Sequence, residues 1–403
     1  MKISDVIIIG GGLSGLMAAA VAANRRQKVT VLTYGSGSFP LASGAIDFLN
    51  VESPEAAIKN LPAHHPYKKV GVKSIDTAAK FFCSITSQAG LIYNGKIFEQ
   101  IPIVTAVGTL KYSGLVPESM NAGKLGSKRK IFVANVKGLK DFYAPMLVGN
   151  LKKYFPDKTF EIAPLDLNLL GGRDVTCMTA AQILTGNEQI LADGLKKLKA
   201  TEDDAIIIPP ILGLEGNSSR ATVKAQSRAD IIETTCLPPS PPGIRLQRAL
   251  KKYLQKTGVR FLENSKVVHG TADGKKITGV IIGSGIREKF FPARKVILAT
   301  GGFYSGGLTM REFDKPTEPI FDLPVFFPTG AENWSNPKLF GEPQGFSTAG
   351  ILTNENLNPV DAGGKILYEN LYVIGANLGG FDFIHERSAG GVAISSAHKA
   401  AMI

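Results

Sequence analysis

The 403-residue sequence predicts an α/β fold with a parallel central sheet, a small antiparallel excursion and an inserted cap domain. Two observations carry this prediction. Near the start, the aliphatic run 5–9 leads through a glycine triplet, residues 10–12, into an alanine-rich segment. Much later, residues 244–302 follow the order helix, strand, antiparallel hairpin and buried strand. Two separate regions of the chain therefore predict one Rossmann-like nucleotide-binding architecture.

The first glycine turn has the spacing of the dinucleotide-binding fingerprint. Gly10 permits the tight turn, Gly12 lets the backbone approach a pyrophosphate, and Gly15 lets the helix lie close to the strand. The free N–H groups at the start of that helix face the anion. A glycine-rich turn without a ligand is the alternative. The predicted cofactor-binding residues of this turn are Gly10, Gly11, Gly12, Leu13, Ser14 and Gly15.

The second strand, residues 28–33, departs from the usual pattern at its end. An adenine dinucleotide fold normally carries Asp or Glu there, to accept hydrogen bonds from the ribose hydroxyls. This chain has Thr33. The departure weakens the case for NAD and leaves room for a flavin that lacks the adenosine half. Further on, Ser43, Gly44 and Ala45 would let the backbone lie against a flat ring system, although a simple turn also explains them.

Residues 54–238 show no second nucleotide motif, and we interpret most of them as an inserted cap or substrate domain. Helical patterns occur in this stretch at 75–89 and 180–199, and strand-like runs at 101–107, 130–136 and 205–208. A proline-rich turn at 238–243 ends the insertion. The predicted domains are a flavin-binding domain in three segments (1–55, 237–302 and 346–403), the inserted cap, substrate or partner domain (56–236) and a cap-like excursion (303–345).

The C-terminal region returns to the nucleotide domain of a flavoprotein. Residues 277–283 and 289–291 predict a hairpin, and 295–298 a buried strand that delivers a threonine and a glycine to the cofactor. A later strand, 371–376, also ends in glycine. The last helix, 392–402, opens with a glycine pair, and its N–H groups would face the flavin pyrimidine carbonyl. Close packing of that helix is the alternative. The predicted cofactor-binding residues here are Thr300, Gly301, Gly375, Gly390, Gly391 and Val392.

Composition limits the function further. The 46 basic and 34 acidic residues favour anionic partners, namely phosphorylated ligands, an acidic subunit, an anionic membrane face or nucleic acid. The lysines are dispersed, which favours solvated helix faces over a nucleic-acid-binding stripe. The three cysteines lie far apart, so we expect no disulfide framework, no four-cysteine iron–sulfur cluster and no metal site. With a strand predicted within the first residues and no membrane-spanning run, we expect a cytosolic protein.

From end to end the chain resembles the B subunit of anaerobic glycerol-3-phosphate dehydrogenase. The resemblance is carried by residues 237–240 (LPPS) with 243–247 (GIRLQ), 298–308 (LATGGFYSGGL), 378–382 (LGGFD) and 395–398 (SSAH). The glycine fingerprint occurs in many flavoproteins, whereas the combined set is specific to this family. Near the last helix the family carries a glycine- and cysteine-rich run, where this chain has residues 387–391 (RSAGG).

The resemblance implies an oxidoreductase of a multi-subunit complex. Such a complex oxidises sn-glycerol 3-phosphate to dihydroxyacetone phosphate and passes electrons to iron–sulfur and quinone partners. The implied partners are a larger FAD-containing subunit and a membrane-associated iron–sulfur subunit, which would place this chain peripherally at the cytoplasmic face of the cell membrane. The resemblance implies FMN as the cofactor of this chain, which fits Thr33 at the end of the second strand, and FAD is the alternative.

Oxidation of the substrate would need a base for the hydroxyl proton and fixed cations for the phosphate. The candidates are His385, Arg245, Lys111 and Arg387, and the sequence does not choose among them. His385 has a suitable side chain for base work, and Arg245 equally fits a helix start with a salt-bridged head. Two alternatives stay open. One is a non-catalytic electron-relay or assembly subunit, and the other is a free-standing flavoprotein that acts on RNA, which the dispersed lysines disfavour.

Overall fold

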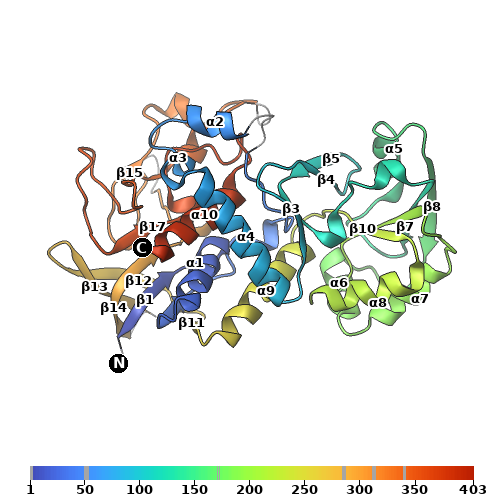
Figure 1. Ribbon diagram of the computed structural model, residues 1–403, viewed down its shortest axis with the longest axis horizontal. Coiled ribbons are helices and arrows are strands. Elements are labelled where there is room, and N and C mark those ends of the chain that lie inside the picture. The colour runs from blue at the N-terminus through green and yellow to red at the C-terminus, as the bar shows by residue number, and fades with distance from the viewer. Residues whose placement is uncertain are drawn as a thin grey trace. The chain divides into compact units, whose positions relative to one another are not determined.

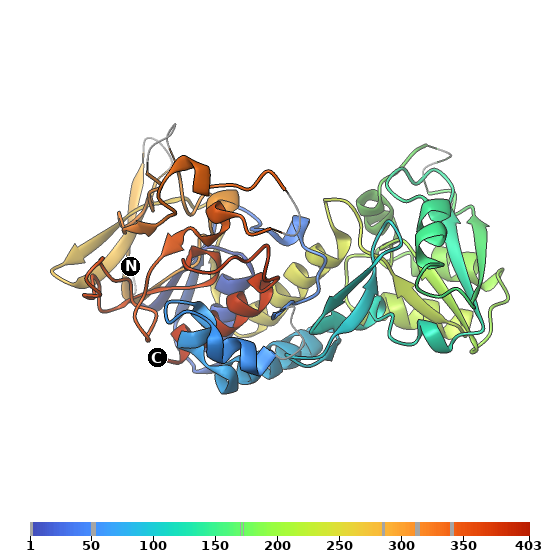
Figure 2. The ribbon, with the colours of Figure 1, turned by 90° about the horizontal axis from the view of Figure 1, so that it is seen from above.

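The structure, a computed structural model, describes residues 3–49, 54–169, 171, 173–283, 287–310, 315–338 and 342–403. By contact the chain divides into two units. Unit 1 comprises Met1–Ser38, Asp47–Ile85 and Leu250–Ile403, and unit 2 comprises Phe39–Ile46 and Thr86–Ala249, coloured mostly cyan to yellow-green (Figures 1 and 2). The domain limits given by the sequence differ from these and remain a prediction.

Unit 1 contains a seven-stranded sheet of order β11-β2-β1-β14-β13-β12, in which β17 also pairs with β14. The neighbours β2, β1, β14 and β17 run parallel, and so does β11 beside β2. Their carboxyl ends therefore lie at one edge, and the predicted Rossmann-like α/β fold is confirmed. The strands are β1 (Ser4–Ile9), β2 (Val29–Leu32), β11 (Arg260–Leu262), β12 (Val267–Asp273), β13 (Lys276–Gly283), β14 (Glu288–Leu298) and β17 (Leu371–Val373), with a separate pair β15 (Val325–Phe326) and β16 (Gly350–Ile351).

Strand β14 joins two elements that the sequence predicts as separate. Its first half pairs antiparallel with β13, and its second half pairs parallel with β1. Pro292, opposite Gly279, lies where the strand passes from one neighbour to the other. Proline cannot donate a hydrogen bond within a sheet, so its presence predicts that a strand ends there. It is tolerated in β14 because the strand changes its pairing partner at this residue.

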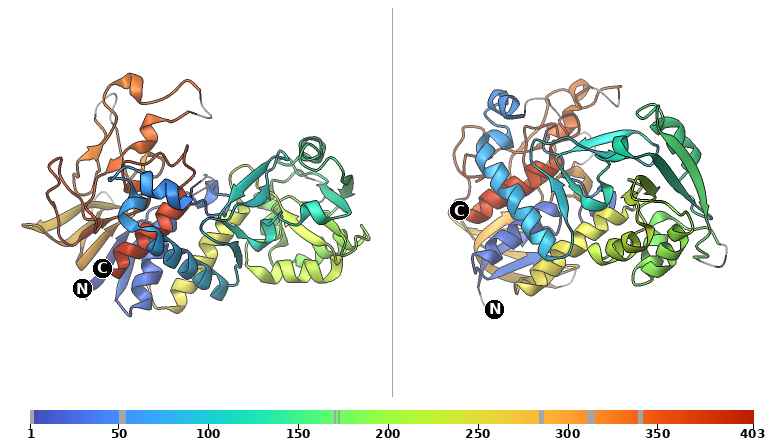
Figure 3. Two further views of the ribbon diagram at one scale, coloured as in Figure 1. Left: turned by 45° about the horizontal axis from the view of Figure 1, so that its top comes forward. Right: turned by 45° about the vertical axis from the view of Figure 1, so that its right-hand side comes forward.

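Helix α1 (Leu13–Asn24) packs against the parallel region of the sheet, in contact with β1, β2 and β14. It is buried from Ser14 to Ala22, and its alanines allow it to pack closely on α10 (Ala389–Met402). Figure 3 shows these two helices, blue and red, side by side. The others are α2 (Pro54–Asn60), α3 (Pro66–Val70), α4 (Val72–Gln88) and α9 (Pro241–Lys256), the last two of which contain a unit boundary. Of the helices that the structure describes, none is long and apolar enough to cross a bilayer.

Unit 2 has a parallel sheet and a core of its own. The sheet order is β10-β9-β7-β8. Alternate side chains of β7 enter two different clusters: Phe132 packs with residues of α6 and α7, and Val133 packs with residues of α5. The strands are β7 (Lys130–Val136), β8 (Thr159–Leu165), β9 (Asp204–Ile208) and β10 (Asp230–Glu233), with the pairs β3 (Tyr93–Gly95) and β6 (Leu115–Pro117), and β4 (Ile101–Val104) and β5 (Leu110–Ser113).

One predicted helix of unit 2 is wrong. The pattern over residues 180–199 is divided between α6 (Cys177–Leu184) and α7 (Glu188–Lys196). The chain breaks at Gly186, whose φ of +80° belongs to a turn and not to a helix. Helices α5 (Ala144–Leu151) and α8 (Asn217–Ser227) complete the unit.

Candidate functional site

Three glycine turns meet at the carboxyl edge of the unit 1 sheet, at the ends of β1, β14 and β17. A Cβ atom on Gly10 would lie 2.2 Å from the Ala299 carbonyl oxygen, so the first two turns are in contact. A Cβ on Gly375 would lie 2.5 Å from Ser14 Oγ, which joins the third turn to the start of α1. Residues predicted from three distant segments are therefore brought together.

Most glycines of the first turn are required by the packing of the protein itself. Gly10 has a φ of +117°, and a Cβ on Gly15 would lie 2.0 Å from the Gly10 carbonyl oxygen. A Cβ on Gly11 would meet the hydroxyl of Thr33 at 2.6 Å. These three positions would demand glycine even if no ligand were bound.

Gly12 is different, because a Cβ there would meet only Gly37 Cα, at an ordinary 3.9 Å. Gly12 is the N-cap of α1, and no side chain caps the helix. Packing therefore leaves room beside Gly12, and no side chain engages the N–H groups of the first turn. Uncapped N–H groups and the helix dipole together favour an anion, so this cradle fits the phosphate of a nucleotide or flavin.

The end of β2 offers no carboxylate to a ribose. Thr33 is buried, packs on Gly11, and donates its hydroxyl to the Gly35 carbonyl oxygen at 2.8 Å. Gly37, with a φ of +60°, passes so close to the first turn that a Cβ there would lie 2.8 Å from Gly12 Cα. The chain after β2 thus lies against the glycine turn, and the Thr33 side chain contributes to the packing of this turn.

Sequence reasoning missed Asn377, which ties two of the turns together. Its side chain is fully buried, accepts the Gly301 N–H at 2.7 Å and donates to Thr300 Oγ1 at 3.0 Å. Ser396 of α10 has a similar role, since its hydroxyl accepts the Gly375 N–H at 3.0 Å. The sequence feature that could have identified Asn377 is its position as a polar residue directly after a predicted strand that ends in glycine.

We expect Asn377→Ala to lower both stability and flavin content. The change leaves the partly buried Gly301 N–H without its acceptor, and the cost is at most the roughly 1–3 kcal/mol of a fully buried donor. Chemical denaturation and the flavin-to-protein absorbance ratio measure the two effects. Unchanged flavin content in a folded Asn377→Ala protein would show that the position of the second turn does not matter for the cofactor.

The start of α10 differs from the prediction at Gly391. Its N–H donates to the Asp47 carbonyl oxygen at 2.8 Å, and the Val392 N–H donates to the Ser388 carbonyl oxygen at 2.9 Å. A Cβ on Gly391 would lie 2.0 Å from the Tyr67 hydroxyl, so glycine is required there by packing. Among the described residues, only the Gly390 N–H of these three predicted contacts has no hydrogen-bond partner.

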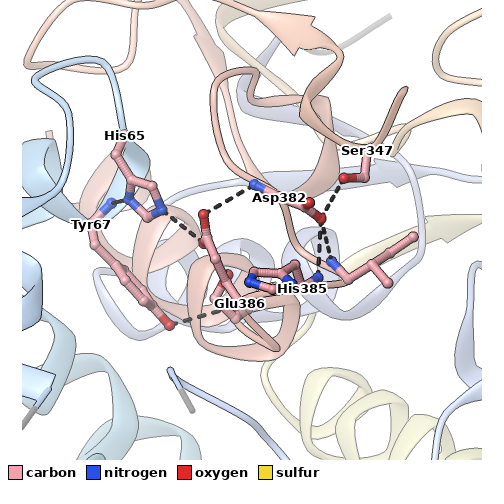
Figure 4. Close-up of polar contacts among 8 residues, drawn as sticks. His65, Tyr67, Ser347, Asp382, His385 and Glu386 are labelled. Carbon is pink, nitrogen blue, oxygen red and sulfur yellow. Dashed lines mark hydrogen bonds and ion pairs between the residues drawn. The ribbon is translucent and has the colours of Figure 1, made fainter. Parts of the chain in front are cut away.

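A buried polar network precedes α10 (Figure 4). Asp382 accepts hydrogen bonds from Ser347 Oγ at 2.5 Å and from the backbone N–H of His385 at 3.0 Å. Glu386 lies 3.0 Å from His65 Nε2, and the His65 ring is almost fully buried. The loop that carries the predicted His385 and Arg387 is therefore held from several sides, while both of those side chains are exposed.

The other candidates group with unit 2. Arg245 is buried in an ion pair with Glu233, at 2.7 and 3.0 Å, and also donates twice to the Gly213 carbonyl oxygen. Lys111 lies on β5 opposite Ile103. The arrangement favours the salt-bridged interpretation of Arg245. Ser43, Gly44 and Ala45 also belong to unit 2, where the Gly44 carbonyl oxygen accepts the Tyr93 hydroxyl at 2.6 Å.

Lys69 of α3 provides a pH-dependent prediction. It is buried and donates to the Thr353 carbonyl oxygen at 2.7 Å, and burial lowers its pKa from 10.5 to about 8. Between these values the unfolded chain binds the extra proton, so this group makes the free energy of unfolding rise with pH. We expect the stability of the wild type, relative to Lys69→Met, to increase between about pH 7.5 and 9.5 in denaturation series. A constant or falling difference would contradict the assignment.

The comparisons with known proteins agree with a site that binds the phosphate of a nucleotide or flavin. The family model described as FAD binding domain matches residues 5–392. Proteins named as the B subunit of anaerobic glycerol-3-phosphate dehydrogenase, from Actinobacillus pleuropneumoniae serotype 5b (strain L20) and Yersinia pseudotuberculosis serotype I (strain IP32953), are 26% and 29% identical to it. Both matches cover 98% of this chain, and they cover 97% and 96% of the relatives.

One further relative and a solved structure complete the comparison. A protein named as the probable B subunit of anaerobic glycerol-3-phosphate dehydrogenase, from Halobacterium salinarum (strain ATCC 29341 / DSM 671 / R1), is 29% identical over 98% of this chain and 96% of its own length. The crystal structure of 3-ketosteroid delta1-dehydrogenase from Sterolibacterium denitrificans aligns with 100% of this chain and 99% of that one, at 14% identity and a TM-score of 0.49.

Proposed function

Because this chain belongs to the family of the FAD binding domain, we propose that it is the flavin-containing subunit of a quinone-linked anaerobic glycerol-3-phosphate dehydrogenase. The reaction is oxidation of sn-glycerol 3-phosphate to dihydroxyacetone phosphate. The names of relatives that match nearly the whole chain support this substrate. The proposed partners are a larger FAD-containing subunit and a membrane-associated iron–sulfur subunit, which together take the electrons towards quinone.

The observation that carries the flavin component of the proposal is the open cradle at Gly12. Packing explains glycine at positions 10, 11 and 15 but not at position 12, and the room left beside Gly12 supports a bound phosphate there. The uncapped first turn of α1 would hold a cofactor phosphate, and the turns at Gly301 and Gly375 would lie along the rest of the cofactor. When bound, a flavin supplies the chemistry of accepting a hydride equivalent from carbon.

The substrate groups of the proposal are on the loop before α10. Arg387 offers an exposed guanidinium suited to a phosphate, and His385 offers an exposed imidazole that can take the hydroxyl proton. Asp382 holds the backbone of His385 and so orients this loop. Arg245 has no role in this proposal, because its donors are engaged with Glu233 and Gly213.

The family match favours FAD over the FMN that the resemblance implies, so we propose FAD, held without the usual carboxylate on the ribose. The purified chain is denatured and the released flavin identified by chromatography and mass. FMN would instead support the assignment made from the sequence. A well-folded chain that binds neither flavin would contradict the proposal.

A second measurement tests the reaction. Glycerol 3-phosphate is added anaerobically to the flavin-loaded chain, with glycerol as the control, and the flavin absorbance is followed. Bleaching by the phosphorylated substrate alone supports a direct role in oxidation. A flavin that stays oxidised, but bleaches when the larger subunit is added with substrate, would favour the alternative of an electron-relay subunit.

A further inference from the structure

Two of the three cysteines, which lie far apart in the sequence, meet in unit 2. The structure holds Cys83, Cys177 and Cys236 as thiols, without a disulfide. Cys177 is the first residue of α6, and Cys236 follows β10 closely. Their side chains are nevertheless joined by a hydrogen bond between the two thiols. Two cysteines can be bridged only when their side chains come together in this way.

Both cysteines lie at the carboxyl edge of the unit 2 sheet. In the order β10-β9-β7-β8, the chain passes from β7 to β8 on one side and then to β9 on the other. Parallel α/β sheets bind ligands outside the carboxyl ends of their strands, at such a reversal. The Cys177 N–H donates to both carboxylate oxygens of Asp141, in the segment after β7, at 2.9 and 3.0 Å. The Thr234 N–H, in the segment that leads to Cys236, donates to the Ile208 carbonyl oxygen at the end of β9, at 3.0 Å.

The two thiols differ in their access to solvent. Cys177 is fully buried, and a buried cysteine of this kind is usually inert. The hydrogen bond with Cys236, burial and the Asp141 carboxylate all raise the pKa of the Cys177 thiol, which keeps it protonated. Cys236 is partly exposed, and it is followed by Leu237, which is 63% exposed. A reagent in solution can therefore reach Cys236 but not Cys177.

We propose that Cys177 and Cys236 form a redox-active dithiol site, which reacts with a low-molecular-weight disulfide and closes to an intramolecular disulfide. An accessible attacking sulfur beside a buried resolving sulfur is the arrangement that this exchange requires. Packing alone explains the buried Cys177, because a buried cysteine behaves as a small apolar side chain. It does not explain a second, accessible thiol in contact with the first. The inference is independent of the flavin.

The exchange balances in two steps. The Cys236 thiolate attacks one sulfur of the external disulfide, so a bond to that sulfur forms while the external S–S bond breaks and a first thiolate leaves. The Cys177 sulfur then gives up its proton and attacks Cys236 Sγ, which forms the protein disulfide and releases a second thiolate. The Asp141 carboxylate, hydrogen-bonded to the Cys177 thiol, is placed to take that proton. Two protein thiols are oxidised, the external disulfide is reduced, and the two protons pass to the released thiolates.

The test uses the full chain in its folded state, with oxidised glutathione as the external disulfide. After an acid quench the protein is unfolded, its remaining thiols are alkylated, and its peptides are mapped by mass spectrometry. We expect a peptide pair joined through Cys177 and Cys236, with the mass of two hydrogen atoms lost and no lasting glutathione adduct. Reduced glutathione should give no joined pair. A pair that forms only when urea is present would overturn the proposal, because the folded site would then not support the exchange.

Two variants test the order of attack. Cys177→Ala removes the resolving thiol, so the joined pair should be lost and glutathione should stay attached to Cys236. Cys236→Ala leaves the buried thiol, so Cys177 should remain unmodified. A glutathione adduct on Cys177 in that variant would contradict the assigned order. A wild type that keeps its adduct on Cys236 without closing would overturn the proposal, and this observation needs no variant to fold.

Cys83→Ala is the matched control. Cys83 lies in α4, within unit 1, and is partly exposed like Cys236, while burial raises its pKa to about 11. The variant should form the joined pair of Cys177 and Cys236 to the same extent as the wild type. Loss of that pair in Cys83→Ala, or equal joining of Cys236 to Cys83 in the wild type, would show that the exchange is not specific to the dithiol of unit 2.

Discussion

Gly12→Ala is expected to give a folded protein that has lost most of its flavin. The new methyl group would have only Gly37 Cα within 4 Å, at 3.9 Å, so the polypeptide accommodates it. Alanine is a poor N-cap residue, and the cost to stability is about 1 kcal/mol or less. The same methyl group fills the space over the first turn of α1, where the phosphate would approach. We therefore expect flavin affinity to fall at least about a hundredfold, corresponding to about 2.8 kcal/mol.

Two further glycine variants show whether the loss is specific. A Cβ on Gly35 would have nothing within 4 Å, so Gly35→Ala should change neither stability nor flavin content. Gly15→Ala should instead prevent folding of unit 1, because its Cβ would lie 2.0 Å from a backbone oxygen of Gly10. Flavin content, circular dichroism and denaturation separate these cases. A Gly12→Ala protein with normal flavin content would remove the main support for the phosphate cradle.

Arg245→Ala is expected to destabilise unit 2 strongly, by about 3–5 kcal/mol, because it leaves a buried charge without its partner. Glu233 is fully buried and, among the described residues, would keep the Ser119 hydroxyl and the Leu212 N–H as its donors. The Gly213 carbonyl oxygen would lose two hydrogen bonds as well. Denaturation followed by circular dichroism measures the change.

The control for this prediction lies three residues further along the same helix, α9. Arg248 also pairs with a glutamate, Glu215, at 3.0 Å, but both side chains are about half exposed. Exposed pairs contribute little, so Arg248→Ala should cost less than about 1 kcal/mol. If both variants lower the free energy of unfolding by the same amount, burial does not account for the contribution of the Arg245 pair to stability. A stable Arg245→Ala protein that fails to oxidise substrate would instead restore Arg245 as a substrate contact.

Elements with a strong local pattern were predicted well from the sequence. The aliphatic run, the glycine turn and the alanine-rich segment form β1 and α1, and the predicted run 130–136 is β7. Such elements can be predicted because hydrophobic periodicity and glycine positions act within a few residues. The pattern fails where a local signal is ambiguous, as at Pro292 within β14 and Gly186 between α6 and α7.

The amino-acid pattern alone is enough to predict the nucleotide-binding class of the fold and the glycines that line its sheet edge. The roles of individual polar groups, in contrast, follow only from the folded structure. Arg245 is paired with Glu233, and Asn377 joins the turn after β17 to the turn at Thr300 and Gly301. The Asp47 carbonyl oxygen accepts the Gly391 N–H, which the sequence predicts to contact a cofactor. Local propensity cannot show these roles, because the partners are separated along the chain by 12, 77 and 344 residues and meet only when the sheet and helices have formed.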